Sequence, residues 1–188
     1  MANQDAAFGF RPTRHLSGGQ MRTEEYAIAA NYGSDIFTGQ VVEAVAAGGI
    51  EQAAAGDTQQ LGVFGGCFYT DPTTSKPTYN AYYPASTNAS DIVAYVYADP
   101  DIVFEAQHDG TGTAAMNHSA LDFAGVGGST TTGISTSELA TSTSGTGAGF
   151  KQIGISKDPE NSDTSSANAN AYCVFSTGEH VYKLITAV

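Results

Sequence analysis

Four histidines are the side chains of this sequence best suited to bind a metal ion or to exchange protons near neutral pH. His108 is followed by Asp109, and His118 lies shortly before Asp122, so folding could bring two imidazoles and two carboxylates together. His108 and His118 nevertheless lack the close spacing that is typical of dedicated metal ligands. We therefore predict no metal site, no cofactor and no catalytic residue from this group.

The remaining histidines and the glycine-rich runs give no catalytic motif either. His15 lies near the N-terminus, and His180 lies in a strand-like run, where a surface or hydrogen-bonded core histidine is the ordinary outcome. The sequence contains neither Gly-x-Ser-x-Gly nor the phosphate-binding pattern Gly-x4-Gly-Lys-Ser/Thr. The run GTGAG at 145–149 lacks the buried strand and the helix that would hold a pyrophosphate, so it indicates a flexible loop. These observations predict a protein that is not an enzyme.

The two cysteines do not form a recognisable site. Cys67 and Cys173 are too far apart for a metal knuckle and too few for a disulfide scaffold. Each is surrounded by aromatic and apolar residues, which favours two buried free thiols. Whether they pair is left open by the sequence.

A proline-rich segment at 70–86 holds three tyrosines and predicts an extended, exposed loop. Tyr79, Tyr82 and Tyr83 could form a patch that stacks on a sugar or contacts a protein, because tyrosine offers a large amphipathic area. The alternative is that these rings pack the loop onto its own β domain.

The elements that position these residues are short and rich in Val, Ile, Tyr and Phe, with a spacing close to period two, which is the pattern of β-strands. We predict an all-β protein, either an antiparallel β-barrel or a β-sandwich, with long Gly/Ser/Thr/Pro-rich loops and an extended N-terminal arm. The expected strands are 24–30, 40–45, 61–70, 92–97, 102–107, 150–156, 171–176 and 180–186.

Turn-forming residues predict how these strands connect. Residues 98–101 and 176–179 are expected to be hairpin turns between antiparallel neighbours. The alanine-rich segment 43–56 is expected to form at most a turn or two of helix, because Gly48-Gly49 interrupts it. The segments 125–133 and 142–149 are expected to be linkers or long loop tips.

Charge divides the chain at residue 22. The whole chain carries a net charge of −12, whereas Arg11, Arg14 and Arg22 beside the single acid Asp5 give residues 1–22 a charge of +2. The remaining residues therefore carry −14, which argues against binding of nucleic acid by the body. We predict an arm at 1–22 and a single β domain at 23–188; the alternative is that the arginines only solvate a terminus. No segment is apolar enough for a signal peptide or a membrane span, so no membrane partner is predicted.

Several segments together carry a resemblance to a known family: AAFGFRPTRHLSGG, TEEYAIAANYGSDIFTGQVVEA, LGVFGGCFYTDPTTSKPTYNAYYP, VAYVYADPDIVFEAQ and the closing FKQIGISKDPENSDTSSANANAYCVFS with EHVYK. With these segments the chain resembles virion structural proteins of tailed bacteriophages, most closely capsid decoration proteins. The resemblance implies a small β-barrel or β-sandwich protein on the outer surface of the capsid, often a homotrimer, that ties neighbouring major capsid proteins together.

In that role the arm would be the main capsid contact, with phenylalanines that fill pockets and arginines that bind carboxylates of the shell. The alternatives are a tail-tube, adaptor or fibre-associated virion protein with a receptor- or glycan-binding surface at 70–86, and a small enzyme that acts on polysaccharide. The expected contact residues of the arm are Phe8, Phe10, Arg11, Arg14 and Arg22.

Overall fold

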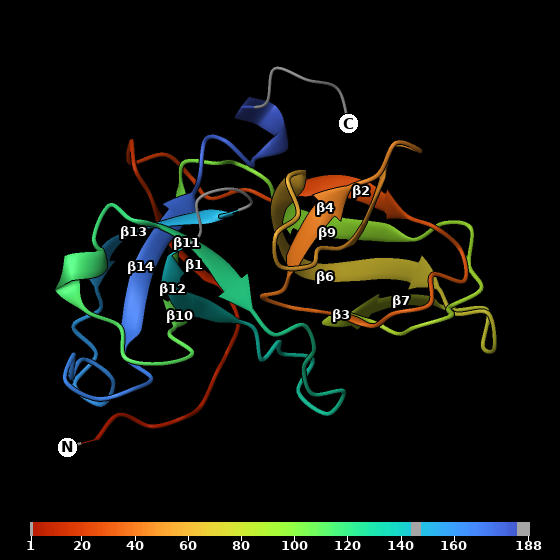
Figure 1. Cartoon of the computed structure of the whole chain (residues 1–188). Helices are drawn as coiled ribbons and strands as arrows, with labels where there is room; N and C mark the ends of the chain where they lie inside the picture. The colour runs from red at the N-terminus through yellow and green to blue at the C-terminus, as the bar shows by residue number, and fades with distance from the viewer. Residues whose placement is uncertain (1, 144–147, 184–188) are drawn as a thin grey trace.

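Two six-stranded sheets form neighbouring halves of the molecule (Figure 1). The computed structural model describes residues 2–143 and 148–183, and it confirms the all-β, mainly antiparallel prediction. In sheet I every pair is antiparallel. The spatial order of sheet I is β1 (Arg11–His15), β10 (Ile102–Gln107), β14 (Asn170–Phe175), β13 (Phe150–Ile155), β11 (Ala120–Ala124) and β12 (Glu138–Thr143).

Sheet II closes into a barrel, because β4 pairs with β6 as well as with β5. Closure leaves no free edge on the strands of the ring, and the one parallel pairing between its strands joins β2 to β5. The ring runs β4 (Val41–Ala44), β5 (Gly49–Gln52), β2 (Glu24–Ile28), β9 (Val93–Tyr97) and β6 (Gln60–Thr70), and β7 (Pro77–Asn80) pairs with the far end of β6.

Over the described residues, the smaller elements are a two-stranded sheet and two 3-10 helices. A two-stranded sheet joins β3 (Ile36–Phe37) to β8 (Tyr82–Tyr83), so the proline-rich segment contains short strands as well as loop. Two short 3-10 helices are η1 (Ala114–Met116) and η2 (Val181–Lys183).

An aromatic cluster lies at the centre of the core that the two sheets share. We define the aromatic cluster as Phe10, Phe104, Phe150 and Phe175. The ring of Phe150 stacks on Phe10 at 4.3 Å and on Phe175 at 4.7 Å, and Phe104 meets both Phe150 and Phe175 edge-on. The same buried cluster includes residues of the barrel, Val41 on β4 and Val63 on β6. One side of the barrel is therefore packed against sheet I.

The N-terminal segment differs from the predicted arm, because Phe10 and β1 are part of the fold. Phe10 is fully buried, and β1 pairs with β10, where it covers an edge that would otherwise be exposed. Gly9 adopts φ +71° and passes so close to Gly39 that a Cβ would lie 2.7 Å from the Gly39 carbonyl oxygen. The charged, proline-containing sequence of Arg11–His15 is typical of an edge strand. The same composition is also typical of an extended arm, so the sequence pattern did not distinguish the two.

The region 43–56 forms a β-hairpin rather than a helical turn. β4 and β5 pair antiparallel, and the chain reverses where the N–H of Gly48 donates to the carbonyl of Val45 at 2.8 Å. Gly48 has φ +86°, a backbone conformation that side-chain-bearing residues rarely adopt. Of the two glycines that argue against a helix, Gly48 ends the turn of the hairpin and Gly49 begins β5.

The expected hairpin at 98–101 is also wrong, because its two strands belong to different sheets. β9 pairs with β2 and β6 in the barrel, whereas β10 pairs with β1 and β14 in sheet I. The burial of the strands explains the difference: β9 alternates between buried and half-buried residues, but every residue of β10 is buried. A strand buried throughout needs a partner strand on each edge and packing on both faces, and the turn carries β10 to such a place between β1 and β14.

The expected last strand at 180–186 is not a strand over its described residues. Residues 181–183 form η2, while residues 184–186 lie outside the described part of the chain. The turn at 176–179 is present, with the N–H of Glu179 donating to the carbonyl of Ser176. His180 makes an isolated β-bridge to Gln60, and β9 pairs with the same strand β6 from Val63 onward.

Removing the Phe10 ring should destabilise the protein strongly, because it leaves a cavity beside Phe150. We expect Phe10→Ala to lower the free energy of unfolding by about 3–5 kcal/mol. The matched control is Phe8→Ala, two residues earlier and half-buried, which should cost clearly less. Urea unfolding monitored by circular dichroism measures both; equal, small losses would mean that Phe10 is not part of the core.

Candidate functional site

The junction groove is an apolar depression of about 190 Å³ where the N-terminal segment crosses the barrel. Its walls are aromatic and aliphatic, and Ile134 is 44% exposed there. Large exposed aliphatic side chains in a depression are typical of surfaces that bind another chain. We define the junction groove by its lining residues, Phe8, Phe10, Arg11, Pro12, Thr38, Gly39, Phe64, Tyr97 and Ile134.

Three of the predicted arm contacts, Phe8, Phe10 and Arg11, line this groove. Phe10 forms its floor from within the core, so it cannot enter a pocket of a partner. Ile134 and Tyr97 come from segments far from residue 10 in the sequence, and no sequence pattern predicts that they lie beside the N-terminal segment. The sequence indicates only that Ile134 is an isolated large apolar residue in a Ser/Thr/Gly-rich segment.

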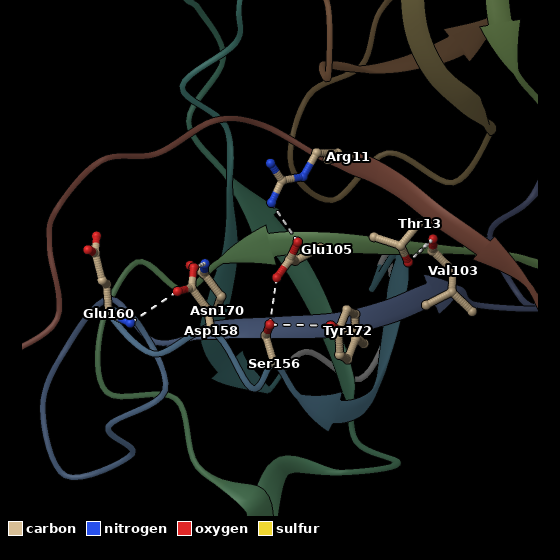
Figure 2. A network of polar contacts seen from close by, with 9 residues as sticks. All are labelled: Arg11, Thr13, Val103, Glu105, Ser156, Asp158, Glu160, Asn170 and Tyr172. Atoms are coloured by element: carbon tan, nitrogen blue, oxygen red, sulfur yellow. Dashed lines mark hydrogen bonds and ion pairs between the residues drawn. The ribbon is translucent and has the colours of Figure 1, made fainter.

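Arg11 lies on the surface, with its side chain 58% exposed, and pairs with a buried carboxylate of the same chain (Figure 2). Its Nη2 donates to Oε2 of Glu105 at 2.6 Å, and the side chain of Glu105 is only 9% exposed. Ser156 Oγ donates to the other carboxylate oxygen at 2.6 Å and lies 3.3 Å from the Tyr172 hydroxyl. A buried carboxylate needs such partners to offset its desolvation. The guanidinium also lies 4.6 Å from the ring centroid of Phe8.

Arg14 and Arg22, the remaining arginines of the predicted arm, also lie on the surface. Arg14 is on β1, three residues beyond Arg11 along the same edge strand. Arg22 lines a second, polar cavity together with Glu24 and His15. Of the five predicted contacts, Phe10 lies in the core, Phe8 lines the junction groove, and Arg11 pairs with Glu105. Arg14 and Arg22 lie on the open surface.

The predicted tyrosine patch is not formed as a unit. Tyr79 is 61% exposed, whereas Tyr83 is fully buried in the barrel core. Tyr82 stacks on Phe37 at 5.4 Å, across the small β3–β8 sheet. Of the three rings, Tyr79 is the one that a sugar or a protein can reach extensively.

His108, Asp109, His118 and Asp122 each make separate contacts. The ring nitrogens of His108 face Leu139 O at 3.2 Å and Gln152 Oε1 at 3.0 Å; burial lowers its pKa, against the effect of the hydrogen bond to Gln152. Oδ1 of Asp109 accepts from Thr141, and Oδ1 of Asp122 accepts from the N–H of Phe123.

His118 is exposed. Among the described residues, the group of three or more potential metal ligands that the fold brings together is a different one: His15, Asp99 and Asp101.

His180 is a core residue at the end of the described chain. It is fully buried, and its ring lies edge-on to Phe175 at 4.8 Å and to Tyr182 at 5.5 Å. Its Nδ1 accepts from the N–H of Tyr182 at 3.2 Å. Burial, which disfavours the imidazolium form, lowers the pKa of His180 to about 4.

Both cysteines are buried free thiols, as predicted. Burial raises the pKa of Cys67 to about 12 and that of Cys173 further still, which keeps both thiols protonated and unreactive.

A group of carboxylates on the barrel was not anticipated from the sequence. Glu43 and Glu51 lie directly opposite each other on β4 and β5, and Asp57 lies near Glu43. Burial raises the pKa of Glu43 to about 7, and the charges of Asp57 and Glu51 add to this effect. The group depends on the β4–β5 hairpin, which the sequence pattern did not indicate.

Comparison of the chain with protein-family models, with curated proteins and with solved structures gives no match. Over the described residues, no helix has the length and apolar character needed to cross a membrane. The site must therefore be interpreted from its own geometry.

Arg11 and Arg14 should differ in their effect on stability. Arg11→Gln removes the charged partner of the buried Glu105 carboxylate, so we expect a loss of about 1–3 kcal/mol. Arg14→Gln removes the same group from the surface and should change stability by less than about 0.5 kcal/mol. Chemical denaturation of the two variants measures this difference, and similar values would contradict an internal role for Arg11.

Stability should fall on acidification through the titration of His180. Burial lowers the pKa of His180 in the folded protein. The neutral ring therefore makes its full contribution to the free energy of unfolding above the unfolded-state pKa of about 6.5, and this contribution is lost as pH falls through about 4. The loss attributable to this residue is on the order of 3 kcal/mol. Thermal unfolding from pH 7 to pH 4 should show a shallower decline for His180→Gln, whereas the control His118→Asn should follow the unsubstituted protein. Parallel curves for His180→Gln and the unsubstituted protein would refute the assignment.

Proposed function

We propose that this protein is a structural component of a tailed-bacteriophage virion, which decorates the outer surface of the capsid and stabilises contacts between major capsid proteins. The observation that carries the proposal is the junction groove, an apolar depression bordered by the exposed edge strand β1. The all-β fold and the sequence resemblance to decoration proteins support it. A decoration protein acts by binding and needs no reaction centre.

The junction groove suits an apolar side chain on an extended segment of the major capsid protein. The floor is supplied by Phe10 and Phe64, which are fully buried and held by the core, so the groove is pre-formed. Exposed Ile134 would lose water on contact. Arg14 on β1 is available to bind a carboxylate of the same segment, whereas Arg11 is occupied by Glu105.

The charge of the molecule supports an orientation on the capsid. The N-terminal 22 residues carry +2 and the remainder carries −14, so the two segments differ in sign. In the proposed arrangement the side that carries β1 faces the shell and the acidic remainder of the molecule faces solvent. The capsid-bound form is proposed to be a homotrimer. Because closure leaves no free edge on the strands of the barrel, trimer formation is expected to depend on the capsid contact rather than on pairing of exposed barrel strands.

Substitution in the groove tests the proposal without disturbing the core. Ile134→Asp places a carboxylate in the apolar contact, so we expect binding to decoration-free capsids to weaken at least about tenfold. The matched control is Val126→Asp, which changes a residue of the same loop that is 51% exposed and lies outside the groove lining. Occupancy is measured by sedimentation with capsids, after circular dichroism has shown both variants to be folded. Unchanged occupancy for Ile134→Asp would contradict the groove as the contact.

The runner-up function is a tail-tube, adaptor or fibre-associated protein that binds a receptor or glycan through the 70–86 segment. The exposed ring of Tyr79 favours it. Tyr79→Ala should leave capsid occupancy unchanged if the protein is a decoration protein. Quantitative mass spectrometry of virions separates the two roles, because hundreds of copies support decoration and a few tens or fewer support a tail role.

A further inference from the structure

His15, Asp99 and Asp101 meet at the end of β1, outside the junction groove. Each residue offers one ligand atom, and these atoms all lie within 4.8 Å of one another. His15 is the last residue of β1, and the two aspartates flank Pro100 in the turn that carries the chain from the barrel to sheet I. The three side chains thus come from segments more than 80 residues apart, which the fold holds together.

Backbone contacts fix this arrangement. His15 is paired with Ile102 in the β1–β10 ladder, and the N–H of Leu16 donates to the carbonyl of Asp101 at 3.0 Å. Within the turn, the N–H of Asp101 donates to Oδ1 of Asp99 at 2.9 Å. That bond orients the Asp99 carboxylate and leaves Oδ2 directed at Nε2 of His15, 2.9 Å away. The ligand atoms are therefore pre-positioned by main-chain geometry rather than by flexible side chains alone.

One pair of these atoms, on His15 and Asp99, is spaced almost as in a coordination sphere, and the third atom, on Asp101, lies within 4.8 Å of both. Two ligand atoms that each lie about 2.0–2.1 Å from a tetrahedral zinc ion are about 3.3 Å apart. The His15–Asp99 distance of 2.9 Å needs an increase of only a few tenths of an ångström to reach it. An ion would replace the proton now shared between the two side chains.

The second nitrogen of His15 has the partner that a metal-bound imidazole requires. Nδ1 lies 2.8 Å from Ser17 Oγ and 3.2 Å from the N–H of Ser17. With a metal on Nε2, the neutral ring carries its proton on Nδ1 and donates it to Ser17 Oγ, at the expense of the longer contact to the Ser17 N–H. Ligating histidines in metalloproteins usually make such a second hydrogen bond, which fixes the tautomer.

Solvent can reach His15 and Asp99 through a polar cavity of about 380 Å³, and Asp101 is itself exposed. His15 and Asp99 line it together with Gln20, Arg22 and Glu24. The side chain of His15 is 10% exposed and that of Asp99 is 47% exposed, so one ligand is held firmly and another is open to an arriving ion. The cavity has room for the water molecules that complete a coordination sphere.

We propose that His15, Asp99 and Asp101 bind a divalent transition-metal ion, with zinc as the best match, and that water fills the remaining coordination. One imidazole and two carboxylates suit zinc and its first-row neighbours, whereas calcium and magnesium prefer oxygen ligands alone. The bound ion links the end of β1 to the β9–β10 turn and so joins the edge strand of sheet I to the barrel. This proposal is independent of the capsid-binding function.

Isothermal titration of the chelator-treated full-length protein with zinc chloride tests the site. We expect one zinc ion per chain, with an affinity at least about tenfold lower for His15→Asn and for Asp101→Asn. The matched control is His118→Asn, which removes an exposed histidine elsewhere and should bind zinc as the unsubstituted protein does. Calcium chloride, titrated in parallel, should bind more weakly than zinc.

Nuclear magnetic resonance of the imidazole nitrogens of the unsubstituted protein provides a readout that does not depend on any variant folding. Zinc should shift Nε2 of His15 and leave His118 unchanged. The absence of saturable zinc binding, an affinity unaltered in folded His15→Asn, or a zinc-induced shift at His118 instead of His15 would each overturn the proposal. Calcium binding as tight as zinc binding would overturn the assigned ion class.

Discussion

The stacking of Phe10 on Phe150 is the contact on which the arrangement of this protein depends. Phe150 also packs against Phe104 and Phe175, so one ring joins the N-terminal segment to three strands of sheet I. Because Val41 and Val63 belong to the same buried cluster, the aromatic cluster also fixes the barrel against sheet I. Burial of this apolar surface, rather than any single polar contact, determines where β1 lies and therefore where every exposed group on β1 is presented.

β1 is held at three successive points, and each has a different physical basis. Phe10, just before the strand, is anchored by apolar packing; Arg11 is anchored by the buried Glu105 carboxylate; and His15 is anchored by Asp99. The junction groove lies at the first of these points and the proposed metal site at the last. An edge strand that is fixed along its length can present a rigid surface to a partner, which reduces the entropy lost on binding.

The sequence pattern predicted strands whose residues alternate between apolar and polar or form a continuous apolar run. It did not predict strands that form because of pairing with distant segments. The strand at 102–107 was located to the residue, because IVFEAQ is buried throughout. The hairpin at 43–56 was missed, because alanine favours helices locally while the closing pair of β4 with β6 favours a strand. The site was predicted less well than the fold: Phe8, Phe10 and Arg11 were named, but as parts of a free arm.

By itself the sequence determined the all-β class, the two buried free thiols and the contrast between a basic N-terminal segment and an acidic body. These follow from composition and from period-two spacing, which are local properties of the chain. Only the tertiary structure decided that Arg11 faces Glu105, that Ile134 meets Phe8 across the junction groove, and that His15 meets Asp99 and Asp101. The physical reason is that these contacts join residues about 80 to 130 positions apart, and their meeting depends on how the two sheets bury a common core.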